Sequence, residues 1–324
     1  MRDATPIISG IILAAGYGER MLPLSDTLPK PLFPILGTPL FEILVRKLMR
    51  HGAADIHCNL HHLPGKIEEF AEGTGWPVRF HRERELLGTG GGVGNMADGV
   101  AGADIILLHN GDIISGLRYE SAISLHRKRG ALVTLVLAPS GPTANVATDD
   151  DDGVVAIGEA AAGHARRARL LGYTGMAVLS PESLPFFPRG EKAELVPILT
   201  AMMRKRPGSV LGWNAAASGE RYAWGDAGSP EGYLAIHRSI LVDKVRFDPA
   251  LEPPPLSIHA GEGAVVDPGT EWKGFCEIGP RAVIERDARL ADCVVLADTV
   301  VARGSVHRNE ILFTGGALKA SGGR

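Results

Sequence analysis

The sequence has few cysteines, no marked excess of charge of either sign and no long apolar run. Its three cysteines form no CxxC pair, and their odd number argues against a disulfide framework and for a reducing compartment. No segment approaches the ~20 consecutive apolar residues of a membrane span, and the first residues lack the cationic region and cleavage site of a signal peptide. We therefore expect a cytoplasmic protein with buried, unreactive thiols and no membrane partner.

The charge balance disfavours one further class of partner. Lysine and arginine total 34 against 37 aspartates and glutamates, which leaves a net charge of −3 and no overall field to attract nucleic acid. The 324 residues are 45% apolar, which disfavours disorder. Because domains typically contain ~100–200 residues, this length favours two domains.

The first two thirds of the sequence predict an α/β domain with a mixed, mostly parallel sheet. Short β-rich runs alternate with helical ones from Ile7 to about Ile236, which is typical of parallel strands covered by helices. A helix face is marked by Leu40, Ile43, Leu44 and Leu48. The predicted strands are Ile7 to Ala15, Asp55 to Leu60, Asp104 to His109, Ala131 to Ala138 and Gly172 to Leu179.

A different pattern begins after Arg246, where prolines form a stiff connector, so we place a domain boundary near residue 245. Beyond it, one residue recurs at every sixth position, as Ala260, Val266, Trp272, Ile278, Ile284, Leu290, Leu296 and Ala302. A second series of small or β-branched residues follows four positions later, as Ala264, Thr270, Cys276, Ala282, Ala288, Val294, Val300 and Val306.

This double period is typical of a triangular parallel β-helix, in which each flat side is one hexapeptide. The region resembles the left-handed β-helix built from hexapeptide repeats. Residues 246–324 would then form this β-helix, with repeats at about 260–307, and a tail. We expect a structural or oligomerisation module with Cys276 in its interior. The oligomeric state stays open, and a homo-oligomer is one option.

A phosphate-binding loop is predicted where the first strand ends. Glycines at the carboxyl end of a strand let backbone N–H groups approach phosphate oxygens, and an arginine adds a planar fork that grips two of them. The next helix does not follow at once, as it would in a dinucleotide-binding dehydrogenase. The residues that we expect at the nucleotide phosphates are Leu13, Ala14, Ala15, Gly16, Gly18 and Arg20.

A lysine between two prolines follows ten residues after Arg20. Pro29 and Pro31 restrict the backbone on both sides of Lys30, so the ammonium is held in place before a phosphate binds. With this spacing the chain resembles the nucleotide-sugar pyrophosphorylases, whose signature is Leu-Ala-Ala-Gly-x-Gly-x-Arg-Met-x-Pro followed by Pro-Lys-Pro-Leu. The resemblance runs to about residue 238. It implies a Rossmann-like nucleotidyltransferase domain over residues 1–245, with Arg20 on the leaving pyrophosphate and Lys30 on the reacting phosphates.

Two aspartates are candidate Mg²⁺ ligands. Asp112 follows a buried strand in the turn Asn-Gly-Asp, where a carboxylate can bind a cation that bridges phosphates, although this turn is ordinary by itself. The segment Trp224 to Pro230 resembles the family's Trp-x-Asp-x-Gly-Thr-Pro, with Ser229 in place of threonine. That resemblance implies that Asp226 is the second ligand.

The same resemblance assigns the base and sugar sites. Leu-Gly-Thr at residues 87–89 matches a family segment near the nucleobase, and a base-reading residue of some relatives falls at Glu83. A carboxylate accepts two N–H bonds from guanine but only one from uracil, which favours GTP slightly. The base-binding candidates are thus Glu83, Gly88 and Thr89, and the sugar-phosphate candidates are Asn110, Gly111, Thr174, Gly175, Glu191, Lys192 and Glu194.

One family feature is missing. Many relatives carry Glu-Lys-Pro before the sugar-facing strand, whereas the matching stretch here is Gly158-Glu159-Ala160. The arginines available as a substitute phosphate contact are Arg166, Arg167 and Arg169, although a basic surface loop is the simpler explanation. Three histidines near the second strand, His57, His61 and His62, lack the partners of a zinc site, and we interpret them as packing or loop residues.

The resemblance implies a transferase that joins a nucleoside triphosphate and a sugar 1-phosphate with Mg²⁺ and needs no general base. The motifs favour a mannose-1-phosphate guanylyltransferase that uses GTP. A uridylyltransferase for a hexose or N-acetylmuramate 1-phosphate shares nearly every motif, and a non-catalytic regulatory homologue remains a third assignment. An acyltransferase is disfavoured, because the repeat is short and its histidines, His259 and His307, lie at its ends.

Overall fold

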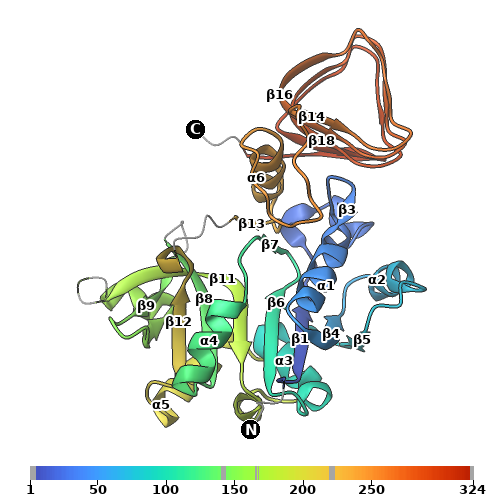
Figure 1. Ribbon diagram of the computed structural model, residues 1–324. Coiled ribbons are helices and arrows are strands. Elements are labelled where there is room, and N and C mark those ends of the chain that lie inside the picture. The colour runs from blue at the N-terminus through green and yellow to red at the C-terminus, as the bar shows by residue number, and fades with distance from the viewer. Residues whose placement is uncertain (1–4, 140–143, 165, 167, 219–222, 322–324) are drawn as a thin grey trace. The chain divides into compact units, whose positions relative to one another are not determined.

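The computed structural model describes residues 5–139, 144–164, 166, 168–218 and 223–321 (Figure 1). The chain forms two compact units, and each is assembled from separate segments. The first unit contains Met1–Gly16, Leu44–Gly111 and Leu117–Tyr222, and the second contains Tyr17–Ile43, Asp112–Gly116 and Ala223–Arg324. The predicted boundary near residue 245 falls inside the second unit, because residues on both sides of it share one hydrophobic core.

The first unit is built on a nine-stranded sheet with strand order β10-β9-β11-β6-β1-β4-β5, in which β8 also pairs with β11 and β12 with β8. Pairing is parallel from β6 through β1 and β4 to β5 and between β8 and β12, and it is antiparallel around β11. The strands are β1 (Ile8–Leu13), β4 (Ala53–Leu60), β5 (Val78–Arg82), β6 (Ile105–Asn110), β8 (Val133–Pro139), β9 (Ala144–Thr148), β10 (Val154–Ile157), β11 (Arg169–Leu179) and β12 (Val210–Asn214).

The predicted mixed, mostly parallel α/β sheet is thus confirmed, and each of the five predicted strands is present with ends shifted by a few residues. The helices are α1 (Leu40–Arg50), α2 (Pro64–Ala71), α3 (Gly88–Val100), α4 (Glu120–Arg129), α5 (Leu195–Lys205) and α6 (Pro230–Leu241). Short 3₁₀ turns lie at Glu19–Met21, Leu24–Asp26, Lys30–Leu32, Gly158–His164, Pro181–Phe186 and Ala215–Ser218. None of the helices in the described part of the chain is long and apolar enough to cross a membrane.

Glycines on α3 let this helix pack closely against the segment before α5. A methyl group added at Gly91 would lie 2.3 Å from the carbonyl oxygen of Glu191, and one at Gly94 would lie 1.9 Å from that of Pro188. The amides of Gly90 and Gly91 both donate to the carbonyl of Ala193, at 2.8 and 3.0 Å. The glycine-rich sequence is therefore needed for packing between two backbones.

The second unit surrounds α6. Its small sheets pair β2 (Pro34–Ile35) with β3 (Thr38–Pro39) and β7 (Ile113–Ser115) with β13 (Trp224–Asp226). One apolar core joins the segment Tyr17–Ile43, α6 and the C-terminal strands, and it includes Phe33, Ile114, Tyr233 and Ile311. Arg238 of α6 also pairs with Asp292 at 3.1 Å. The C-terminal region is therefore packed directly on the helix that follows β13.

The C-terminal strands stack as parallel coils with three flat sides (Figure 1). Parallel pairs join residues 18 or 17 positions apart, as in Glu271↔Arg289 and Val283↔Val300, which is the arrangement of the predicted parallel β-helix. The strands are β14 (Ile258–Ala260), β15 (Val265–Val266), β16 (Glu271–Ile278), β17 (Val283–Ile284), β18 (Arg289–Val295), β19 (Val300–Val301), β20 (Val306–Arg308), β21 (Glu310–Phe313) and β22 (Gly316–Lys319). The left-handed sense of this β-helix stays a prediction.

The six-residue register holds only through Leu290. Ile278, Ile284 and Leu290 are interior, as are Cys276, Ala282 and Ala288. After Asp292 the interior positions are Cys293, Val295 and Val301, whereas Val300 and Val306 are 62% and 67% exposed. The extension of both series past residue 290 is therefore wrong by one position. The reason is that β18 has one residue fewer than β16 at this point, since Lys273 pairs with Ala291 but Cys276 pairs with Cys293.

Replacing Gly94 by alanine tests the close packing of α3. In an open helix this change would stabilise the protein by about 0.5–1 kcal/mol. Here the methyl group meets the Pro188 carbonyl, so we expect a net loss of roughly 1–3 kcal/mol in the free energy of unfolding. Urea unfolding measures this loss. Gly102→Ala is the control, because its added methyl meets no atom within 4 Å. A Gly94→Ala variant as stable as this control would contradict the packing argument.

Candidate functional site

The predicted phosphate loop begins directly after β1. Its residue Ala14 is hydrogen-bonded to the sheet, and Gly16 is exposed. Ala14 and Ala15 are buried, and the Ala14 amide donates to Asn59 Oδ1 of the neighbouring strand at 2.8 Å. Gly16 is exposed, and a methyl group added there would meet no atom within 4 Å. The backbone at Gly16 is therefore accessible to a ligand, while the residues before it are held by the sheet.

In the second unit, the side chain of Lys30 packs against Gly18 of the predicted phosphate loop. Gly18 has a φ of +76°, and a methyl group there would lie 3.1 Å from both Lys30 Cε and Ser25 Cβ. The Ser25 hydroxyl donates to the Gly18 carbonyl at 2.9 Å. Lys30 itself begins a 3₁₀ turn after Pro29. The loop therefore requires glycine at position 18 both for its backbone conformation and for the lysine side chain.

Lys30 points at the first candidate metal ligand. Its Nζ lies 3.5 Å from Asp112 Oδ2, and the two side chains are 15% and 30% exposed. Asp112 and Asp226 stand at neighbouring ends of the antiparallel pair β7–β13, and the Ala227 amide donates to the Asp112 carbonyl at 2.8 Å. The strand pairing therefore brings together two carboxylates from distant parts of the sequence.

Gly228 marks the point where these side chains converge. Its amide donates to Asp226 Oδ1 at 2.7 Å. A methyl group added at Gly228 would lie 2.7 Å from Arg20 Nη2, 2.7 Å from Asp226 Oδ1 and 3.1 Å from Asp112 Oδ2. All four candidate residues of the catalytic and metal sites, Arg20, Lys30, Asp112 and Asp226, thus lie around one short backbone segment of the second unit.

The electrostatics of Asp112 favour a cation at this point. Burial raises the pKa of its carboxyl group, the charge of Lys30 opposes this shift, and the negative charge of Asp226 adds to it. Two partly buried like charges repel each other, and a divalent cation between them would remove that repulsion. Within the described ranges, no three histidine, cysteine, aspartate or glutamate side chains form a complete metal site. Two carboxylates suit Mg²⁺, which takes its other ligands from phosphates and water.

The helix α6 fixes both sides of this cluster. Ser229 caps its first turn by accepting the Gly232 amide at 3.2 Å, and Gly232 has no side chain to collide with the Asp226 carbonyl. At the next residue, the Tyr233 hydroxyl donates to the carbonyl of Pro34, and its ring packs edge-on against Phe33. The same helix therefore holds Asp226 and the loop that carries Lys30.

The candidate base site of the first unit has polar groups that already have partners. Glu83 is 6% exposed, and its carboxylate accepts from Asn59 Nδ2 at 2.7 Å and from the Leu87 amide at 3.0 Å. The Thr89 hydroxyl donates to Glu194 at 3.2 Å and accepts the Leu195 amide at 3.0 Å. Gly88 has a φ of +71°. The base-reading role of Glu83 stays a prediction. In this structure the Glu83 carboxylate links Asn59 to the Leu87 amide.

The candidate sugar-phosphate residues fall into buried and exposed groups. Thr174 is 1% exposed and its hydroxyl donates to the Val136 carbonyl at 2.8 Å, so it bonds within the sheet. Gly175, with a φ of +79°, lies where the β11–β8 register shifts. The Gly111 amide donates to the Leu13 carbonyl at 2.8 Å, and a methyl group added at Gly111 would lie 2.7 Å from the same oxygen. The remaining candidates lie at the surface or partly exposed, and they are Asn110, Glu191, Lys192 and Glu194.

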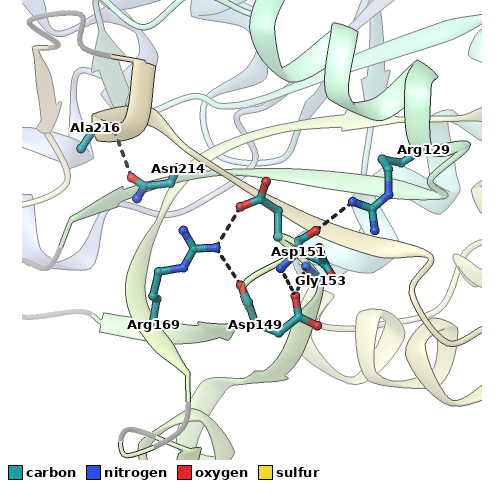
Figure 2. A network of polar contacts seen from close by, with 8 residues as sticks. Arg129, Asp149, Asp151, Gly153, Arg169, Asn214 and Ala216 are labelled. Carbon is teal, nitrogen blue, oxygen red and sulfur yellow. Dashed lines mark hydrogen bonds and ion pairs between the residues drawn. The ribbon is translucent and has the colours of Figure 1, made fainter.

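The structure narrows the search for a substitute for the missing lysine. The guanidinium of Arg169 donates to the Asp149 carbonyl at 2.7 Å and to Asp152 at 3.0 Å, within an acidic turn that Arg129 also contacts through Asp151 (Figure 2). Arg169 is thereby committed to this turn. Arg166 is exposed, and Arg167 lies outside the described residues.

Sequence reasoning missed Asn59, Gly228 and Tyr233. Asn59 is 3% exposed near the end of β4, and such a buried amide needs partners. The strand also contains Asp55 and His57, so the sequence did not single out Asn59. Gly228 and Tyr233 gave no separate signal, because their importance comes from close approaches to side chains that lie far away in the chain.

Comparisons with known proteins agree with this geometry. The family described as Nucleotidyl transferase matches residues 9–160. The mannose-1-phosphate guanylyltransferase of Mycobacterium tuberculosis is 29% identical over 94% of this chain and 84% of its own length. The N-acetylmuramate alpha-1-phosphate uridylyltransferase of Neisseria meningitidis serogroup B is 30% identical over 61% of this chain and 86% of its own length.

A solved structure shares the fold. A putative glucose-1-phosphate thymidylyltransferase from Bacillus anthracis, in complex with sucrose, superposes with a TM-score of 0.61. It is 17% identical and covers 74% of this chain and 97% of its own. At this identity the likeness concerns the fold alone.

His109, the residue before Asn110, is expected to make stability depend on pH. It is fully buried, and burial, assisted by the charge of Lys47, lowers its pKa from 6.5 to about 3. The unfolded state therefore binds a proton more readily, so stability falls as the pH drops from 6.5 towards 3. At about 1.36 kcal/mol per pKa unit, His109 costs about 2 kcal/mol between pH ~7 and pH ~5.

Urea unfolding at these two pH values measures this effect. His109→Gln should lose about 2 kcal/mol less stability on acidification than the unmodified protein. His164→Gln, at an exposed histidine, is the control and should keep the original pH dependence. An unchanged pH dependence in His109→Gln would contradict the burial of a neutral imidazole.

Proposed function

The chain belongs to the nucleotidyl transferase family, and from that premise we propose that it makes a nucleoside diphosphate sugar from a nucleoside triphosphate and a sugar 1-phosphate, with release of pyrophosphate. The observation that carries the proposal is the convergence of Arg20, Lys30, Asp112 and Asp226 around Gly228. Two cations beside two carboxylates suit a reaction between two polyanions and a divalent metal. We place the reaction in the cytoplasm, as expected from the free thiols.

We propose mannose 1-phosphate and GTP as the substrates. The guanylyltransferase relative aligns over 94% of this chain, which includes most of the β-helix as well as the sheet domain. A uridylyltransferase is the second candidate, since the N-acetylmuramate relative is 30% identical over 86% of its length. These relatives agree on a sugar 1-phosphate and differ in the base.

The reaction is an in-line displacement at the α-phosphorus. An oxygen of the sugar phosphate forms a new bond to this phosphorus, the bond to the pyrophosphate breaks, and its electron pair leaves with the pyrophosphate. The sugar phosphate is already an anion at neutral pH, so no residue has to remove a proton. The protein has to align the two anions and neutralise the charge that grows on the leaving group.

Each charged residue has a proposed part in this step. Asp112 and Asp226 would hold Mg²⁺, which would supply positive charge to the phosphate oxygens. Lys30 neutralises the reacting phosphates, and its 3₁₀ turn limits the freedom that it loses on binding. Arg20 grips the pyrophosphate, and the open backbone at Gly16 offers amides to the triphosphate. Glu191, Lys192 and the Thr174–Gly175 segment are proposed at the sugar phosphate.

A substrate panel tests the proposed activity. Pyrophosphate release is measured with Mg²⁺ for GTP, UTP, dTTP, ATP and CTP, each combined with mannose, glucose, N-acetylglucosamine and N-acetylmuramate 1-phosphates. We expect GTP with mannose 1-phosphate to be the productive pair. A productive UTP pair would replace the guanylyltransferase assignment. If no pair reacts while nucleotide sugars still bind, the chain is a regulatory homologue.

Asp112→Asn tests the metal site. The substitution removes one of the two charges that would hold Mg²⁺, so we expect kcat to fall roughly 100- to 1,000-fold with the productive pair. Asp150→Asn, in the exposed acidic turn, removes the same charge and should leave kcat unchanged. Full activity in Asp112→Asn would remove Asp112 from the metal site.

A further inference from the structure

A buried chain of hydrogen bonds links the start of the phosphate loop to the turn before α3. The Ala14 amide donates to Asn59 Oδ1 at 2.8 Å, and Asn59 Nδ2 donates to Glu83 Oε1 at 2.7 Å. Glu83 Oε2 accepts the Leu87 amide at 3.0 Å. We call these four residues the Asn59–Glu83 relay. It connects two predicted nucleotide-binding segments that are separated by about 70 residues of sequence.

The relay is enclosed by protein. Asn59 and Glu83 are 3% and 6% exposed. A methyl group added at Gly92 of α3 would lie 2.6 Å from Asn59 Nδ2 and 3.4 Å from Glu83 Oε1, so this helix covers the contact between the two side chains. The Glu83 backbone is also fixed, because its amide donates to the Leu60 carbonyl at 2.7 Å. Water therefore has little access to replace a lost partner.

The order of donors and acceptors in the relay is fully determined. Both ends, at Ala14 and Leu87, are backbone donors, so each of the two side chains must offer an acceptor outward. Asn59 then has only its NH₂ group left for the inner contact. The residue at position 83 must accept at both ends of its side-chain group, which a carboxylate does and the amide of a glutamine does not. The carboxylate of Glu83 is thus required by its neighbours in the protein.

We propose that Asn59 and Glu83 are positioning residues, which set the backbone of the phosphate loop and of the Leu87–Gly88 turn so that the nucleotide binds a preformed site. This inference rests on the proposed function and refines it, because it gives Glu83 a role within the protein in place of direct base reading. Loss of the relay weakens binding of every nucleoside triphosphate alike, whereas loss of a base-reading group changes the preference between GTP and UTP.

Two substitutions that are harmful alone should be harmless together. In Glu83→Gln, the glutamine NH₂ group faces a donor in either orientation. It meets the NH₂ group of Asn59 in one orientation and the Leu87 amide in the other. In Asn59→Asp, two carboxylates meet in a buried place. In the double variant Asn59→Asp with Glu83→Gln, the aspartate accepts from Ala14 and from the glutamine NH₂, and the glutamine oxygen accepts from Leu87. Every donor then has an acceptor again, and the total charge is that of the unmodified protein.

The double-mutant cycle is measured first by KM and kcat with the productive substrate pair. We expect each single variant to raise the KM for the nucleoside triphosphate roughly tenfold or more, since one hydrogen bond to a charged group is lost. The kcat and the KM for the sugar phosphate should change less, and the GTP to UTP preference should stay constant. The double variant should recover most of the loss. Glu85→Gln, at an exposed glutamate two residues away, is the matched charge control.

The cycle is measured again without substrates, by urea unfolding and by amide hydrogen exchange at Ala14 and Leu87. Both amides should exchange faster in the single variants and regain protection in the double variant. This readout tests the relay even if the unmodified protein turns over no substrate pair, a result that would count against the proposed function alone. A double variant no more stable or protected than the single variants overturns the inference, as does a changed base preference in Glu83→Gln.

Discussion

The antiparallel pairing of β7 with β13 is the constraint on which the candidate site of the second unit depends, because it brings the carboxylates of Asp112 and Asp226 together. Burial raises the pKa of the Asp112 carboxyl group, and the negative charge of Asp226 adds to this shift. Such a pair persists only if cations and backbone amides accompany it. The protein supplies Lys30, Arg20 and the Gly228 amide. Much of the surrounding structure, including the cap of α6 and the Tyr233 hydroxyl, keeps these groups in place.

The sequence was sufficient to predict the strands of the sheet and the proline-flanked Lys30 segment, because both are encoded locally. Each predicted strand is a short apolar run, and Lys30 stands between two prolines whatever the rest of the fold does. The meeting of Asp112 and Asp226 needed a family resemblance, since more than a hundred residues separate them. The one-residue shift after Asp292 was not predictable from periodicity, because either register places small or β-branched residues inside.

Glycine and buried polar residues explain the remaining differences. The resemblance assigned Gly88 to the nucleobase, and the structure shows that Gly91 and Gly94 of the same helix let two backbones approach one another. The resemblance assigned Glu83 to base reading, whereas its partners in the protein are Asn59 of β4 and the Leu87 amide of the next turn. In both cases the residue type was informative, but its partner was set by tertiary packing, which no local pattern encodes.

The core around α6 also has a consequence for biosynthesis. It contains residues from Met21 to Ala320, so it combines a segment made early with the last coils of the β-helix. On the ribosome, the Lys30 loop leaves the exit tunnel long before Tyr233 and Ile311 exist to pack against it. Contacts between such distant segments cannot form before both have left the ribosome, and non-local contacts form more slowly than local ones. The core that holds the Lys30 loop is therefore completed only after α6 and the stacked coils that follow it have been synthesised.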